Sequence, residues 1–163
     1  DLELKLLDPL TDVDLFREAY NWRLRPKKHI QPDRMPFETF SGTDPTHIAV
    51  GAFNGEFLAV FFFHEFEPGC FESHFTSKRG VPRETLLIAA RQVIGYFLEN
   101  GARELTAWIV ERNRPLRTFV EALEFTEQER RVIPTQLSAC VQDDGSLNSV
   151  SVERNFVKYV KKA

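Results

Sequence analysis

The sequence predicts an α+β domain with a central, mostly antiparallel sheet of about seven strands and helices on its faces. An Asn54-Gly55 pair lies between two runs of apolar, β-branched and aromatic residues, which is the strongest short signal for a hairpin. Residues 70–110 read as strand, helix and strand, because the apolar period lengthens to helical spacing after Gly80. Such a crossover makes its two strands parallel neighbours. The other strands are expected to pair antiparallel.

The first half of the chain is expected to hold four strands and one main helix. Thr11 or Asp12 can cap a helix that runs to about Trp22. Four prolines between Pro26 and Pro45 predict a loop with one short helix at residues 35–40. The strands are expected at residues 2–7, 47–53, 56–66 and 70–76.

The second half is expected to begin with a long amphipathic helix over residues 82–100. Pro82 suits its first turn and Gly101 suits the position after its end. A strand at 105–110, a helix opened by Asn113, and strands at 130–137 and 149–160 follow, the last two joined by a turn at 143–146. The last strand could pair with a second copy, but pairing with 130–137 is the preferred interpretation.

Size, charge and cysteine content narrow the function classes. The 163 residues make one domain, 1–163, and 42% hydrophobic with 28% charged residues is ordinary for a soluble protein. A net charge of −3 provides no basic field for nucleic acid, although residues 23–28 are locally basic. No apolar run approaches the ~20 residues that span a membrane. Cys70 and Cys140 have no zinc-ligand spacing, so we expect no metal site and a cytoplasmic location.

The order and spacing of these elements resemble the GNAT family, the Gcn5-related N-acetyltransferases. The most specific match is a family pattern around the second helix, held here by Asn113, Leu116, Phe119, Val120 and Phe125. Glu124 replaces the family's glycine before the last of these. The resemblance covers residues 2–159 and is weakest over 25–45. The fold that it implies is a GNAT-like sheet splayed between its fourth and fifth strands.

The resemblance implies that acetyl-CoA or a related acyl-CoA binds at this splay, between residues 70–76 and 105–110. The pyrophosphate would meet backbone N–H groups at the N-terminus of the following helix. The family's glycine-rich pattern is altered here, so side-chain charge is expected to replace part of the backbone cradle. The alternative is a solvated turn that only caps the helix. The expected contacts are Phe75, Thr76, Lys78, Arg79, Gly80, Arg83, Asn113 and Arg117.

Catalysis in the family is the direct attack of an amine on a thioester, which needs a base and an acid. The base is often a glutamate on the fourth strand, where Glu72 and His74 here share one face. Burial would raise the pKa of such a carboxyl group toward neutrality. The alternative is a Glu–His pair that orders the core. Asn113 is the third candidate, with a plain helix cap as its alternative, and Val120 stands where the family's usual acid, a tyrosine, would be.

The sequence therefore predicts an N-acyltransferase whose acceptor is a small-molecule or peptide amine. We expect no membrane or nucleic-acid partner, and a monomer or homodimer. The alternative function is a GNAT fold without turnover that serves as a binding or assembly module. The strand around Glu72 and its basic loop also resemble divergent bacteriophage proteins of this fold, which suits that alternative.

Overall fold

The computed structural model describes residues 1–22, 31–32, 47–141 and 147–163. Three predictions lie outside these residues: the basic run at 23–28, the short helix at 35–40 and the turn at 143–146.

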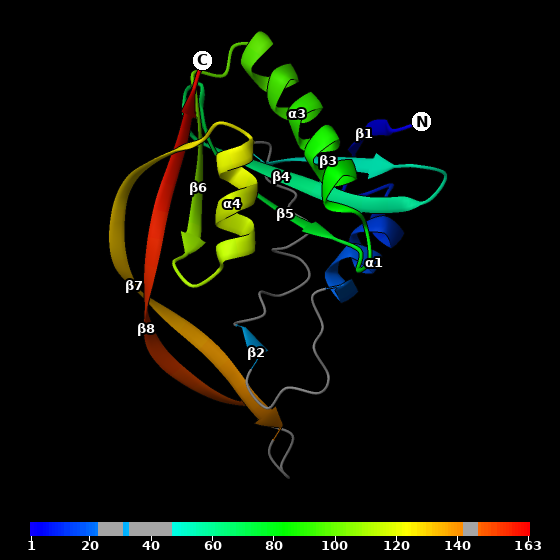
Figure 1. The fold of residues 1–163 in the computed structure, drawn as a ribbon. Helices are drawn as coiled ribbons and strands as arrows, with labels where there is room; N and C mark the ends of the chain where they lie inside the picture. The colour runs from blue at the N-terminus through cyan, green and yellow to red at the C-terminus, as the bar shows by residue number, and fades with distance from the viewer. Residues whose placement is uncertain (23–30, 33–46, 142–146) are drawn as a thin grey trace.

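The described strands form one eight-stranded sheet in the order β1-β3-β4-β5-β6-β8-β7-β2 (Figure 1). The predicted fold class is confirmed, and the strand beyond the expected seven is the two-residue β2, which pairs with β7. The strands are β1 (Glu3–Leu7), β2 (Gln31–Pro32), β3 (His47–Phe53), β4 (Phe57–Glu67), β5 (Cys70–Ser77), β6 (Glu104–Val110), β7 (Thr126–Val141) and β8 (Leu147–Lys162).

The strands β5 and β6 are parallel neighbours for only three residues each. Cys70 to Glu72 pair with Glu104 to Thr106, after which β5 continues beside β4 and β6 continues beside β8. The other neighbouring strands pair antiparallel. The predicted parallel crossover and its divergence are therefore confirmed, and the parting of β5 from β6 is called the split below.

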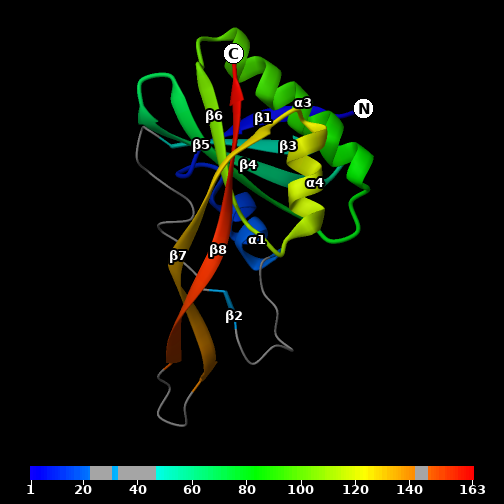
Figure 2. The ribbon, with the colours of Figure 1, turned by 60° about the vertical axis from the view of Figure 1, so that its left-hand side comes forward.

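The structure contains the two predicted hairpins, one in the middle of the chain and one near its end. The turn with Gly55, at φ 73°, joins β3 to β4, and β7 pairs along most of its length with β8 inside the chain. The last two strands form a long curved hairpin that extends away from the helices (Figure 2). The preferred pairing of residues 149–160 within the chain is confirmed.

Helices cover the two faces of the sheet unequally. The helices α3 (Arg83–Glu99) and α4 (Arg114–Ala122) pack on one face, and α1 (Val13–Trp22) packs on the other (Figures 1 and 2). Alternation along β4 supplies both cores, because Phe61 faces α3 and α4 while Phe62 faces α1. In the described part of the chain, no helix is long and apolar enough to cross a membrane.

Candidate functional site

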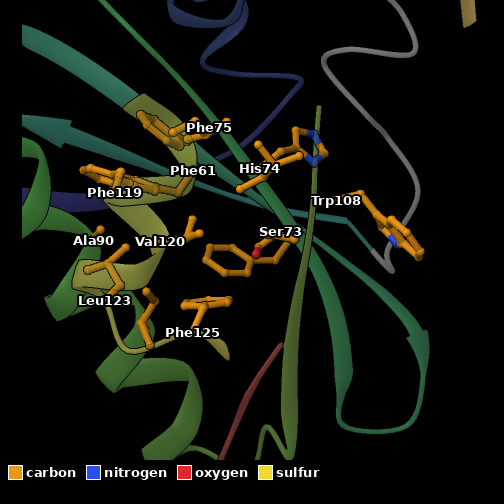
Figure 3. A pocket seen from close by; sticks show the side chains of 15 residues that line it. Phe61, Ser73, His74, Phe75, Ala90, Trp108, Phe119, Val120, Leu123 and Phe125 are labelled. Carbon is orange, nitrogen blue, oxygen red and sulfur yellow. The ribbon is translucent and has the colours of Figure 1, made fainter. Parts of the chain in front are cut away.

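A cavity of about 100 Å³ lies at the split, beneath α3 and α4 (Figure 3). Phenylalanine rings line much of it. The Phe75 ring stacks on Phe61 and on Phe119, with centroids 5.5 and 5.1 Å apart. The small side chains of Ala90 and Ala107 leave room between the helices and β6. The lining therefore suits a slender, largely apolar group that enters between the parted strands.

The closed end of the split contains a buried hydroxyl. Glu72 and Thr106 are the last paired residues, and the Ser73 hydroxyl one position later donates to the Thr106 carbonyl at 3.0 Å. The Thr106 side chain is only 2% exposed, and its Oγ1 has no hydrogen-bond partner among the residues that the structure describes. An unpaired buried hydroxyl costs free energy, so this atom is a natural partner for a bound molecule or a water.

Glu72 and His74 lie on the face opposite the phenylalanine lining, as their spacing predicts. Figure 3 shows His74 on that side of the strand. His74 stacks on Phe62 with centroids 5.3 Å apart. The expected burial of Glu72 is wrong, because its side chain is exposed. The short helix α1 packs over the Val60–Phe62 part of the sheet, and Glu72 is not part of that cluster.

A row of polar residues crosses four strands on this same face. The register aligns His47 with His64, His64 with Glu72, and Glu72 with Thr106. The two imidazole rings stack with centroids 4.3 Å apart. The sequence alone does not show that these two histidines meet, because their contact depends on the register of β3 and β4. The row brings two imidazoles and a carboxylate to the closed end of the split, and side chains of these kinds accept and donate protons in catalysis.

The loop before α3 combines a glycine in the left-handed region with two arginines. Gly80 has φ 84°, and Pro82 precedes the helix without a side-chain cap. The first N–H groups of a helix have no partner inside the helix. Arg79 and Arg83 are exposed beside them. This arrangement provides positive charge and backbone donors together, the combination that binds phosphate.

Lys78 and Thr76 are held by the neighbouring strand β4. The Lys78 N–H donates to the Leu58 carbonyl at 2.8 Å, and its ammonium is 2.8 Å from the Glu56 carboxylate. That hydrogen bond and the Glu56 charge raise the pKa of Lys78. Thr76 pairs with Val60 in the β4 ladder. Lys78 is therefore already neutralised by an acidic partner.

Asn113 and Arg117 perform structural tasks at α4. The Asn113 Oδ1 accepts from the Leu116 N–H at 3.2 Å, so Asn113 caps the helix. The Arg117 Nε donates to the hydroxyl of fully buried Tyr159 at 3.0 Å, and its Nη1 donates to the Glu111 carbonyl at 3.1 Å. Burial raises the pKa of Tyr159. The Arg117 guanidinium thus holds α4 against β8.

Glu124, at the position where the GNAT resemblance implies glycine, follows α4 in the left-handed region with φ 67°. Glycine adopts this backbone conformation without steric cost, whereas other residues are strained in it. The Glu124 carboxylate, which is largely exposed, lies 3.3 Å from the Lys161 ammonium. Glu124 therefore makes this turn at the expense of local strain.

Within the described residues, no group of three or more His, Cys, Asp or Glu side chains is placed to hold a metal ion.

The sequence matches no protein-family model and no curated protein.

Solved structures share the fold over nearly the whole chain. The ribosomal-protein alanine N-acetyltransferase from Escherichia coli is 15% identical, with a TM-score of 0.70 over 99% of this chain and 94% of that one. A GNAT-family acetyltransferase from Streptococcus pneumoniae is 10% identical, with 0.67 over 100% of both chains. A Bacillus subtilis acetyltransferase in complex with CoA is 13% identical, with 0.65 over 100% of this chain and 99% of that one. The chain therefore has the GNAT fold.

Proposed function

We propose that the protein is an N-acyltransferase that transfers an acetyl group from acetyl-CoA to an amine by direct attack. One observation carries the proposal: at the split, an apolar cavity on the helix face meets a row of titratable side chains on the other face. The likeness to solved acetyltransferases, one of them in complex with CoA, supports it. The acceptor would be a small-molecule or peptide amine.

The residues at the split fit an acyl-CoA. The phenylalanine-lined cavity suits the slender arm that ends in the thioester, with Phe75 and Thr76 at the parted end of β5. The uncapped N-terminus of α3, with Gly80, Arg79 and Arg83, suits the pyrophosphate. Lys78 and Arg117 are left out of the proposed phosphate contacts because Glu56 and Tyr159 hold them.

The polar row would perform the proton transfers. Acetyl-CoA supplies an activated carbonyl: the amine nitrogen bonds to this carbon, the carbon–sulfur bond breaks, and the products are an amide and the free thiol. Glu72 would accept a proton from the attacking ammonium, and the stacked His47 and His64 next to it would pass that proton to water. A thiolate with a pKa of about 8.5 needs little help from an acid. This explains how Val120 can stand in the tyrosine position.

The test is the release of free thiol from acetyl-CoA in the presence of a broad panel of amines, with the mass of the acetylated product measured in parallel. The proposal predicts thiol release that depends on both substrates and a mass gain on at least one amine. Thiol release without a mass gain would be hydrolysis. No release with any amine would contradict the proposal.

The second candidate is a GNAT-fold module that binds without turnover, and one observation favours it. Phe61, Phe75 and Phe119 form a continuous stack at the split, which narrows the passage to the opposite face. A bacteriophage origin, inferred from resemblance, belongs to this alternative. It predicts that no amine is acetylated, whether or not acetyl-CoA binds.

A further inference from the structure

Three residues near the split form a cationic aromatic platform on the face of Glu72 and His74. Trp108 of β6 has the Arg131 guanidinium 5.1 Å and the Lys158 ammonium 5.7 Å from its ring centroid. These distances are in the range of cation–π attraction. The ring points away from the phenylalanine lining, on the same side as His74 (Figure 3). We refer to Trp108, Arg131 and Lys158 as the Trp108 platform.

The platform lies next to the point where the split closes. Trp108 is two residues beyond Thr106 on β6, so both side chains are on one face of the sheet. The register places Lys158 opposite Trp108 on β8. His74 and Trp108 border the cavity from the two parted strands. A molecule that presents its amine at the split from this face therefore rests its other end on the platform.

The charge of the platform selects a monoanion. Arg131 is paired with the Glu129 carboxylate at 3.1 Å, so these two side chains cancel. Lys158 has no acidic partner among the residues that the structure describes, and it is half-buried. Glu129 also lies opposite Lys158 in the β7–β8 register, so Arg131, Lys158 and Glu129 together sum to one positive charge, with Glu72 farther along the same face. A carboxylate matches the charge of these three side chains, whereas a dianionic phosphate exceeds it. The ammonium already placed over Trp108 loses little side-chain freedom when it binds such a group.

From this geometry we propose that the Trp108 platform binds the carboxylate of the acceptor, and that the acceptor class is an amino acid. The inference rests on the proposed function in one respect: the bound amino acid is the acceptor only if the protein transfers an acyl group. The binding of the carboxylate itself does not depend on turnover. The product of the proposed reaction would be an N-acetylamino acid, which should bind in the same place.

The test uses Trp108 fluorescence in a Trp22→Phe background, which leaves one tryptophan. The probes are N-acetyl-leucine and its neutral amide, which differ only in the carboxylate and contain no reactive amine. We expect the carboxylate to bind at least about tenfold more tightly than the amide, as charge-assisted hydrogen bonds are the stronger kind. Added salt should shrink the difference because the site is partly exposed.

The variant Lys158→Gln should reduce the preference for the carboxylate to about threefold or less. Lys162→Gln, an exposed lysine on the same strand, removes the same charge and should leave the preference unchanged. Equal affinity for the two probes in the unmodified chain would overturn the proposal, and so would an unchanged preference in Lys158→Gln. Inorganic phosphate that competes more tightly than N-acetyl-leucine would also overturn the assignment to a carboxylate.

The two proposals fail separately. If the probes discriminate as expected but no amine is ever acetylated, the proposed acyl transfer is wrong and the carboxylate site stands. If amines are acetylated but the probe pair binds equally, the carboxylate site is wrong and the proposed acyl transfer stands.

Discussion

The two faces of the sheet differ most sharply at the split. On the helix face, Phe61, Phe75 and Phe119 stack around an apolar cavity. On the opposite face, Glu72 and the Trp108 platform present charge. The same two strands supply both surfaces, because side chains alternate along a strand. A sheet that parts between two strands can thus bring an apolar site for one reactant against a polar site for the other.

The largest effect, on kcat, is expected from replacing Glu72, which lies on the polar face at the closed end of the split. Glu72→Gln keeps the shape and removes the carboxylate. If Glu72 is the base, kcat should fall by about 10²–10⁴-fold with acetyl-CoA affinity unchanged, and the pH–rate profile should lose its acidic limb. Steady-state kinetics with calorimetry checks both parts. Glu99→Gln, exposed at the end of α3, is the matched control and should have the original kcat. A variant that keeps its rate but melts lower would show that Glu72 is structural.

A smaller effect, on the affinity for acetyl-CoA, is expected from changes in the loop before α3. The double variant Arg79→Gln/Arg83→Gln should raise the Kd for acetyl-CoA about tenfold at low salt. The loss should shrink at high salt because exposed charges are screened. Calorimetric titrations at two salt concentrations measure this. Arg91→Gln/Lys162→Gln, which removes two exposed charges elsewhere, should bind as tightly as the unmodified chain. Equal affinity in both double variants would mean that the loop only precedes a helix.

The smallest effect, a change in stability, is expected from replacing Glu124, which follows the C-terminal end of α4. Glu124→Gly should relieve the strain at φ 67° and stabilise the fold by roughly 0.5–1 kcal/mol, after the entropy of glycine in the unfolded chain is subtracted. Thermal unfolding should show a rise of about 1–4 °C, with kcat unchanged. Glu124→Ala removes the same charge but retains the strain, so its melting temperature should not rise. A rise in both variants would assign the effect to charge instead.

Local signals were enough to predict the sheet and its split. The Asn54-Gly55 turn and the change of period after Gly80 indicated the hairpin and the crossover, and both are present. The two-residue spacing of Glu72 and His74 also predicted that they share one face of the strand. The burial of Glu72 could not be predicted in this way, because it depends on which part of the sheet α1 covers.

Long-range register explains what the sequence could not show. A two-residue turn at Asn54-Gly55 would align His47 with Phe62. The hairpin instead pairs Phe53 with Phe57, which moves the register by one residue, and the irregularity between Ala52 and Phe53 moves it by one more. The total shift of two residues makes His64 the partner of His47. The stacked histidines follow from that shift.

The Trp108 platform depends on sheet order rather than on local pattern. The strand β8 lies between β6 and β7, which brings Lys158 and Arg131 to Trp108 from positions 50 and 23 residues later in the chain. The pairing of Lys78 with Glu56 has the same origin, because it joins the ends of two adjacent strands.

The central claim is that the helix side of the split binds an acyl-CoA, and thermal unfolding with acetyl-CoA tests it most directly. A ligand at about 100 times its Kd adds about 2.7 kcal/mol to the free energy of unfolding. For a chain of this size, that corresponds to a rise in melting temperature of about 5–10 °C. We predict such a rise with millimolar acetyl-CoA and a smaller one with ADP, which has the pyrophosphate but lacks the arm that enters the cavity. An unchanged melting temperature at millimolar acetyl-CoA would contradict the account.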